Sequence, residues 1–480
     1  MKLFDTLSRE VRELSPRDGQ VFRFYCCGPT VYGPAHIGNF RTFVLQDVFR
    51  RTLEMSGFDT LHVRNLTDVD DKTIRDSQAA GESLEAFTQH WTARFHEDCA
   101  RLNLRSPHHE PTATGHIEQQ IALIAELVEK GHAYRSEDGS VYFRVESFPE
   151  YGRLSHLDKR ELKFGAAVAD DEYEKDSVAD FALWKGQKPE DGDNWWESPW
   201  GPGRPGWHLE CSAMCREFLG DTFDLHSGGV DLIFPHHENE IAQSEAATGC
   251  RMSDHWFHLT HLVVDGGKMS KSLGNFYTLE QLEQAGFSGA EVRYVLLSAH
   301  YRQPLNFVAR DKEGNETFPS LAGARQALER LARFEGALRE KADAGDSLDY
   351  EAIGGQESEA LGEFAAVRDA LQNDLNTPDA LGRLFSAMKA VKPESLDPAE
   401  ARRQLTGFRV GIEALGLALP DLEAASSADV PDEVRALAEQ RFAAKQAKDW
   451  ATADALRDQV TELGWTIKDG KEGYELEPAG

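Results

Sequence analysis

The sequence contains little of what secreted and membrane proteins need. Its 480 residues include only six cysteines at irregular spacing, so a disulfide-stabilised fold is not expected. No apolar run approaches the roughly 18 residues that a membrane-spanning helix requires. The first residues, MKLFDTLSREVRELSP, are charged throughout and lack the apolar segment of a signal peptide. We therefore expect a cytoplasmic protein with no membrane partner.

Positive charge is also scarce. The sequence has 52 lysine and arginine residues against 82 aspartate and glutamate residues, which gives a formal net charge of -30. Proteins that bind nucleic acid usually carry a basic surface, because the phosphates must be neutralised. Any nucleic-acid partner must therefore bind a local basic patch on a chain that is acidic overall.

The pattern of apolar residues predicts an α/β fold for the N-terminal part. A short buried strand over 21–27 is followed by a Gly/Pro-rich loop over 28–34. A helix then begins near His36 or Asn39, and a second strand follows over 60–65. Strand, glycine loop, helix and strand form the start of a nucleotide-binding Rossmann unit, whose sheet is parallel.

The character of the chain changes three times after this unit. Residues 133–205 are irregular and rich in Trp, Gly, Pro and Asp, and the α/β pattern returns over 206–305. Amphipathic helix dominates 306–425, and the pattern of 431–480 predicts helices around 432–463 followed by a hairpin. We therefore predict a Rossmann-type catalytic domain, split into 1–132 and 206–305 by an insertion domain. An all-α helical bundle and a small C-terminal α+β unit would follow.

Two segments have the composition of phosphate-binding loops. The first, PAHIGN, lies between a strand and a helix N-terminus, where free backbone N–H groups and the helix dipole favour an anion. Gly38 lets a phosphate approach the backbone, and His36 can donate a hydrogen bond to it. In the second, KMSKS, Lys268 and Lys271 lie three residues apart after Asp-Gly-Gly. Two such lysines are suited to neutralise the charge that develops on a polyphosphate during transfer.

Together, and in this order, the two segments resemble the HIGH and KMSKS signatures of class I aminoacyl-tRNA synthetases. The second signature is intact. The first reads HIGN, so Asn39 keeps a hydrogen-bond donor but lacks the charge of a histidine. The resemblance implies attack of an amino-acid carboxylate on the α-phosphate of ATP, with Mg²⁺ on the phosphates. It also implies that Gly38, Asn39 and Lys271 contact ATP.

Further segments narrow the resemblance to one family. CGPTVYGPAHIGN, GWHLECS, FPHHENEIAQ and KMSKSLGN are similar to segments of the cysteinyl-tRNA synthetases and occur in that family's order. VRNLTDVDDK and the C-terminal helices extend the similarity over essentially the whole chain. The resemblance implies one Zn²⁺ ion per chain, held by Cys27, Cys211, His236 and Glu240. These donor types bind Zn²⁺ tetrahedrally, although Cys211 and Cys215 remain an alternative ligand pair.

A zinc site would explain how the protein selects cysteine. Cysteine and serine are nearly isosteric, so the shape of a pocket discriminates weakly between them, whereas a soft metal prefers the thiolate. The resemblance also places Thr67 and Trp207 at the substrate, has His226 close the pocket and has Asp231 face the nucleoside. A packing or turn-capping role is the alternative for each of these four residues.

The resemblance predicts a cysteine–tRNA ligase with three substrates: ATP, L-cysteine and the cysteine-accepting tRNA. We expect a monomer that forms cysteinyl-adenylate and then esterifies the terminal ribose of tRNA. A ligase that joins cysteine to a small amine is an alternative, but it would have no use for the C-terminal helices. A non-catalytic tRNA-binding protein is a second alternative, and it would not need an intact KMSKS segment.

The predicted anticodon-binding unit, 431–480, needs a local basic patch. The candidates are Arg435, Arg441, Lys445 and Lys448. In one continuous helix, residues 441, 445 and 448 would share a face. Trp450 or Trp465 would give an unstacked base an aromatic surface, unless these indoles belong to the core.

Overall fold

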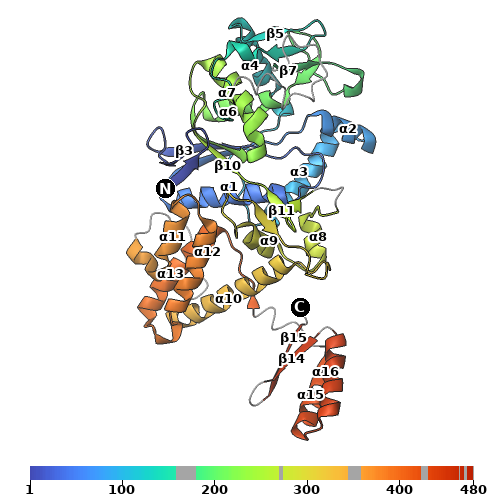
Figure 1. Ribbon diagram of the computed structural model, residues 1–480, viewed down its shortest axis with the longest axis vertical. Coiled ribbons are helices and arrows are strands. Elements are labelled where there is room, and N and C mark those ends of the chain that lie inside the picture. Colours follow the sequence, from blue (N-terminus) through green and yellow to red (C-terminus); the bar gives the residue numbers. More distant parts are fainter. Residues whose placement is uncertain are drawn as a thin grey trace. The chain divides into compact units, whose positions relative to one another are not determined.

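A computed structural model describes the chain over seven segments: residues 1–157, 180–269, 274–343, 358–422, 431–463, 465–469 and 473–478 (Figure 1). The chain divides into two compact units, which we describe separately. The first contains residues 1–327 and 334–418, and the second contains residues 328–333 and 419–480. Among the described residues, no helix is long and apolar enough to cross a membrane.

A parallel sheet of four strands forms the centre of the first unit, in the order β10-β9-β3-β4. Its strands are β3 (Val21–Cys26), β4 (Asp59–Arg64), β9 (Phe223–Gly229) and β10 (Ser253–Leu259). Parallel neighbours need a crossover, and helix α1 (Ile37–Met55) supplies it between β3 and β4. The helix buries Phe40, Val44 and Val48. The predicted Rossmann-type sheet is therefore confirmed.

The start of α1 explains the asparagine in HIGN. His36 is the N-cap, and its Nδ1 accepts a hydrogen bond from the backbone N–H of Asn39 at 3.1 Å. In return, the side-chain oxygen of Asn39 accepts the backbone N–H of His36 at 3.1 Å. This reciprocal pair is a capping box, which satisfies two helix-terminal donors. Because Nδ1 is an acceptor here, the neutral imidazole carries its proton on Nε2.

A second sheet lies within the region predicted as an insertion. It is antiparallel, in the order β5-β6-β7-β8. Its strands are β5 (Ala133–Arg135), β6 (Val141–Phe143), β7 (Phe181–Gly186) and β8 (Gly203–Pro205). Helices α2 (Asp71–Ala80), α3 (Leu84–Arg101) and α4 (Ile117–Glu129) precede it, and α6 (Trp207–Leu219) and α7 (Glu238–Thr248) follow it.

Helices dominate the remainder of the first unit. A small sheet contains β11 (Leu262–Val264), β12 (Gly267–Lys268) and β13 (Leu305–Phe307). The helices are α8 (Leu279–Gln284), α9 (Gly289–Leu296), α10 (Pro319–Ala342), α11 (Ala365–Gln372), α12 (Thr377–Ala390) and α13 (Pro398–Leu415). The N-terminal hairpin pairs β1 (Lys2–Asp5) with β2 (Glu10–Glu13). The domain boundaries drawn from the sequence remain predictions.

Buried charges join α1 to α9 and α13. Arg293 is fully buried and donates to Asp47 Oδ2 at 2.5 Å and to the carbonyl oxygen of Leu415 at 2.9 Å. Arg51 donates to the same carboxylate oxygen at 2.7 Å and reaches Glu413 Oε1 at 2.5 Å. We call Asp47, Arg51, Arg293 and Glu413 the α1 charge cluster. Buried charges of this kind persist only with partners, so the cluster fixes α1 against the two other helices.

The second unit packs helices α15 (Asp432–Gln446) and α16 (Trp450–Glu462) against the hairpin of β14 (Trp465–Asp469) and β15 (Tyr474–Pro478). The prediction that residues 441, 445 and 448 form one basic face is wrong. Arg441 is only 3% exposed, and Lys448 lies beyond the end of α15 with a φ of 61°. Trp465 packs against the core of this unit, whereas Trp450 is 59% exposed. Trp450 is therefore the more exposed of the two indoles.

Candidate active site and metal centre

The structure brings the HIGN segment against the chain that surrounds KMSKS. The backbone N–H of Ile37 donates to the carbonyl oxygen of Tyr277 at 3.0 Å, and the ring centroids of His36 and Phe276 lie 4.9 Å apart. A Cβ atom on Gly38 would lie 2.8 Å from Met269 Cε and 2.9 Å from the His36 ring. A side chain at position 38 would therefore clash with these groups.

Of the two lysines of KMSKS, only Lys268 lies within the described residues. Lys268 is exposed on β12, and its carbonyl oxygen accepts a hydrogen bond from Asn275 Nδ2 at 3.1 Å. Lys271 lies outside the described residues, so its predicted role at the transferred phosphate stays a prediction.

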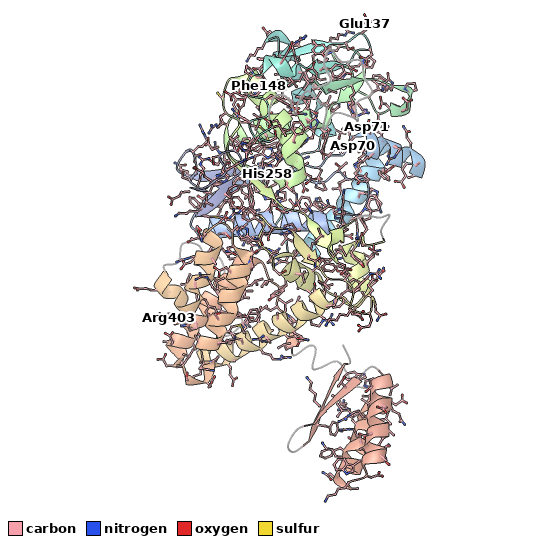
Figure 2. All side chains as sticks on the ribbon, viewed as in Figure 1. Asp70, Asp71, Glu137, Phe148, His258 and Arg403 are labelled. Carbon is pink, nitrogen blue, oxygen red and sulfur yellow. The ribbon has the colours of Figure 1, made fainter. Side chains whose placement is uncertain are left out.

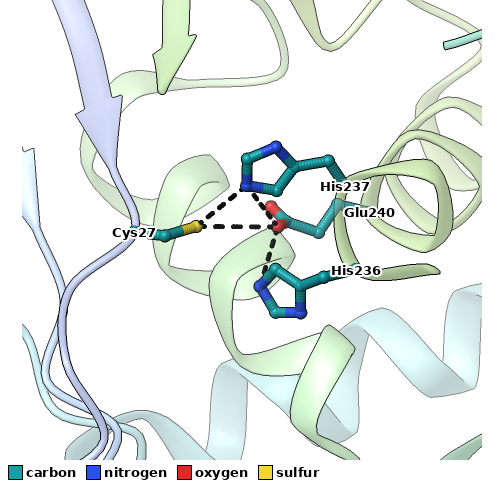
Figure 3. A group of neighbouring side chains, drawn as sticks. All are labelled: Cys27, His236, His237 and Glu240. Atoms are coloured by element: carbon teal, nitrogen blue, oxygen red, sulfur yellow. Dashed lines mark hydrogen bonds and ion pairs between the residues drawn. The ribbon is translucent and has the colours of Figure 1, made fainter. Parts of the chain in front are cut away.

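Three of the four predicted metal ligands, Cys27, His236 and Glu240, form with His237 a group whose donor atoms all lie within 4.8 Å of one another, and Cys211 lies beside Cys27. Cys27 directly follows β3, Cys211 lies on α6, His236 lies in the turn before α7, and Glu240 lies in the first turn of α7. The two sulfur atoms are 3.9 Å apart although the cysteines are 184 residues apart in the sequence. Glu240 Oε1 lies 3.9 Å from Cys27 Sγ and 3.1 Å from His236 Nε2 (Figure 3). We call Cys27, Cys211, His236 and Glu240 the metal cluster.

The geometry and chemistry of the metal cluster fit a zinc ion. Atoms bound about 2.0–2.3 Å from one tetrahedral centre are about 3.3–3.8 Å from each other. Three of the six separations among these donors, at 3.1, 3.9 and 3.9 Å, are within a few tenths of an ångström of that range. Two thiols, one imidazole and one carboxylate are also donors that zinc accepts. All four side chains are buried, so water competes little for these positions.

Burial and neighbouring charges polarise the metal cluster. A hydrogen bond from the Cys27 thiol lowers the pKa of Cys211 to about 6, while burial raises the pKa of Cys27 well above its ordinary value. Burial opposes a charged His236, but Glu240 and Cys211 outweigh it and raise the pKa of His236 to about 10. Burial likewise opposes an ionised Glu240, but His226 and His236 lower its pKa to about 2. At neutral pH Glu240 is therefore ionised and His236 carries a proton, which a bound metal ion would have to displace.

His237 is a fifth donor that the sequence did not single out. Its Nε2 lies 3.2 Å from Cys27 Sγ and 3.9 Å from Glu240 Oε1, on the other side of the carboxylate from His236 (Figure 3). The resemblance predicts His236 alone as the histidine ligand, four residues before Glu240 and on the same helix face. The two histidines end the turn η5 (Ile233–His237), four and three residues before Glu240, so both imidazoles lie on the face that carries this carboxylate.

Cys215 belongs to a separate group of donors. Cys215, His226 and Glu240 offer atoms within 4.8 Å of one another, and all three residues are buried. Cys211 instead contacts Cys27 and His236. Cys211 and Cys215 therefore have different neighbours. A metal site that uses both cysteines stays an alternative, which substitution of each cysteine in turn can test.

The predicted substrate residues surround the metal cluster in different ways. Trp207 is 39% exposed, and its ring centroid lies 4.3 Å from that of His236, so it borders the cluster on the open side. Thr67 is buried and its hydroxyl accepts a hydrogen bond from Asn65 at 3.2 Å. His226 is fully buried, with its Nε2 atom 2.8 Å from Glu240 Oε2. Asp231 is exposed in η4 (Val230–Leu232), after the carboxyl end of β9, where such sheets bind nucleotides.

Glu210 is a buried acid that sequence reasoning missed. It lies in the first turn of α6, beside Cys211, and its side chain is fully buried. Burial, with Cys211 and Asp68 nearby, raises the pKa of Glu210 well above its ordinary value, and the Thr67 hydroxyl only partly offsets this. A glutamate at the start of a helix usually reaches solvent, so GWHLECS gave no signal for it.

Comparison with known proteins identifies the family. Residues 13–314 match the family model described as "tRNA synthetases class I (C) catalytic domain", and residues 427–475 match "Cysteinyl-tRNA ligase anticodon binding domain". The chain is 54% identical to the cysteine–tRNA ligase of Opitutus terrae over 488 residues, which cover 100% of this chain and 99% of that protein. The chain belongs to the cysteine–tRNA ligase family.

Other relatives agree with this assignment. The cysteine–tRNA ligase of Chlamydia caviae is 44% identical, with coverage of 99% of this chain and 97% of that protein. Residues 366–419 match a DALR domain. A solved structure of Mycobacterium tuberculosis methionyl-tRNA synthetase with methionyl-adenylate gives a TM-score of 0.55 at 17% identity, covering 82% of this chain and 89% of that one. That similarity concerns the fold, and the class I resemblance drawn from the sequence motifs is confirmed.

Proposed function

We propose that the protein activates L-cysteine with ATP and transfers it to the 3' end of its cognate tRNA, with one zinc ion selecting the substrate thiolate. The observation that carries this proposal is the convergence of the metal cluster at the carboxyl end of β3. The same strand leads into the HIGN loop, so an amino acid held at the cluster would lie next to the phosphate site.

The chain's own residues would prepare the amino-acid site. Bound at the metal cluster, zinc would supply a soft Lewis acid that accepts a thiolate far better than a hydroxyl. Glu240 would be oriented by His226 and His236, which contact its two different oxygen atoms. Trp207, exposed beside His236, would cover the bound side chain. Thr67 would position the amino-acid backbone.

The N-terminus of α1 would hold the triphosphate, which enters with Mg²⁺. The capping box leaves His36 with a proton on Nε2, which can donate to a phosphate oxygen. Gly38 keeps the backbone accessible, while Lys268 and Lys271 would neutralise charge that develops on the phosphates during adenylate formation. Asp231, at the end of β9, would face the nucleoside.

The second unit would bind the anticodon region of the tRNA, and the match of 427–475 supports this assignment. The same match weighs against a ligase that joins cysteine to a small amine, because such an enzyme needs no anticodon reader. The complete metal cluster weighs against a non-catalytic descendant. The monomeric state and the cytoplasmic location remain predictions.

Cysteine-dependent ATP–pyrophosphate exchange, followed by tRNA charging, tests the proposal. Exchange with cysteine but not with serine, together with about one zinc per chain, is expected. Exchange without charging would support the amine-ligase alternative, and absence of exchange in the zinc-loaded protein would refute the proposed function. The proposal for zinc itself fails if serine and cysteine have comparable specificity constants.

A further inference from the structure

A cavity lies in the first unit beside the proposed amino-acid site and takes no part in the adenylation described above. Its volume is about 720 Å³. One wall is the polar face of α3, a second is the turn that contains Thr112 and Thr114, and a third is the segment 193–196 of the insertion. Asp68, which directly follows Thr67, also lines it. The cavity therefore adjoins the chain that would position the amino acid.

The lining of the cavity is unsuited to phosphate. It includes three carboxylates, from Asp68, Glu85 and Asp193, and no lysine or arginine among the described residues. Asp68 is held in place by Thr114, whose backbone N–H donates to Asp68 Oδ1 at 2.9 Å and whose hydroxyl donates to Oδ2 at 2.5 Å. Four threonines and the amides of Gln89 and Asn194 add neutral hydrogen-bonding groups. An uncharged ligand with amino donors suits this wall.

Two consecutive tryptophans have different surroundings at the cavity. The backbone of Trp196 exchanges hydrogen bonds of 2.7 and 3.0 Å with Gly203, and its indole packs against a buried cluster that includes Leu84. Trp195 is half-buried and lines the cavity. Across the part of the chain that the structure describes, its indole makes no hydrogen bond and no contact with another ring. Trp195 thus offers an aromatic face next to a residue that is anchored by its backbone to Gly203.

The insertion wall is also tied to α2. Asp71, at the start of that helix (Figure 2), receives an ion pair from Lys185 at 3.0 Å and another from Arg204. Gln78 Nε2 donates to the carbonyl oxygen of Glu190 at 2.9 Å. These contacts hold the insertion against the catalytic core, so the cavity has a defined width.

We propose that this cavity binds a nucleobase from the single-stranded 3' end of the tRNA, stacked on Trp195. The inference rests on the proposed function, which requires that end to reach the amino acid beside Thr67. Unstacked bases rest on aromatic side chains, and stacking tolerates any base. Carboxylates accept hydrogen bonds from exocyclic amino groups, as they do from cytosine N4. All three bases of the CCA end of tRNA carry such an amino group, while its phosphates would stay outside the acidic cavity.

A comparison of two tRNAs tests the inference. Dissociation constants are measured for intact tRNA and for tRNA that lacks its three terminal nucleotides, with wild-type protein, Trp195→Ala and Trp195→Phe. We expect Trp195→Ala to weaken binding of intact tRNA about tenfold, the scale of one lost base–aromatic stack, and to leave the truncated tRNA unaffected. Phenylalanine keeps a stacking face, so Trp195→Phe should bind intact tRNA within about threefold of wild type.

Trp450→Ala in the second unit is the matched control. Any weakening that it causes should be the same for both tRNAs, because Trp450 is expected to act independently of the cavity that would hold the 3' end. Ala93→Phe, on the exposed face of α3, fills the cavity from the opposite wall and removes no contact. It should reproduce the loss with intact tRNA even if Trp195→Ala folds poorly.

Equal weakening of both tRNAs by Trp195→Ala and by Ala93→Phe would overturn the inference, as would no weakening of either. Cysteine-dependent pyrophosphate exchange by the wild-type protein is measured in parallel. Its absence would mean that the proposed function itself fails, whereas its presence together with an unselective effect of the variants would refute the cavity alone.

Discussion

His226 gives the sharpest test of how the metal cluster is organised. The sequence placed it at the substrate, but its Nε2 lies 2.8 Å from Glu240 Oε2, with the side chain fully buried. The other carboxylate oxygen, Oε1, lies 3.1 Å from His236 Nε2. Removing the donor at residue 226 therefore frees one oxygen of Glu240 and lets the carboxylate rotate away from the metal cluster.

The expected magnitude follows from this contact. Loss of a group that orients a metal ligand typically lowers metal affinity about 10–100-fold. We expect this loss in His226→Leu, measured as the zinc dissociation constant in competition with a chromogenic chelator. Glutamine places an amide nitrogen near the position of Nε2, so His226→Gln should recover much of the affinity. At saturating zinc, the cysteine KM of both variants should stay close to that of wild type.

The matched control is His258, the histidine near the middle of the first unit in Figure 2. Its Nε2 lies 2.7 Å from His237 Nδ1, and among the described residues it forms no hydrogen bond or ion pair with Glu240. If His237 is not a ligand, His258→Leu should bind zinc nearly as well as wild type. Zinc affinity within about twofold of wild type in His226→Leu, with a raised cysteine KM, would refute the reasoning and return His226 to the substrate pocket.

Three further outcomes are expected. Cys211→Ser should lose zinc and cysteine-dependent exchange while Cys215→Ser retains both, as elemental analysis and exchange assays can check; the reverse would favour the alternative ligand pair. Asp47→Asn should lower the free energy of unfolding by about 3–5 kcal/mol in urea titrations, because the fully buried guanidinium of Arg293 loses its anion. Burial lowers the pKa of His62 well below its ordinary value, so below about pH 6.5 the unfolded chain binds a proton that the folded protein does not. Stability should therefore fall with decreasing pH, by up to about 1.4 kcal/mol per pH unit, and His62→Phe should reduce that slope in urea titrations at pH 5–7.5; an unchanged slope would contradict this.

The sequence was sufficient for the features that depend on local pattern. The run of apolar residues in 21–27, the glycine loop and the spacing of Phe40, Val44 and Val48 specify strand, turn and helix directly. The motif resemblance then supplied the family. The burial of Arg441 could not be predicted from the residues around it in the sequence. This arginine shares a face of α15 with the buried Val434 and Ala438, but a charged side chain at such a position usually ends in solvent.

The site required tertiary information in three places. His237 and His236 lie three and four residues before Glu240 and so both face it, but this spacing does not tell which histidine approaches Cys27. Glu210 differs from an ordinary helix-start glutamate only through the chain packed over it. The structure also gives Asn39 a role that the HIGN spelling did not reveal, since its side-chain oxygen completes the capping box with His36.

The α1 charge cluster has a consequence for how the protein can be divided. The match to the class I catalytic domain ends at residue 314, but Glu413 and the carbonyl oxygen of Leu415 lie beyond it and bind Arg51 and Arg293. A fragment that stopped at 314 would leave both guanidinium groups without these acceptors. The helix that begins at His36 would then be weakened at its far end. The segment that matches the catalytic-domain family is therefore shorter than the segment that is needed to hold the catalytic domain together.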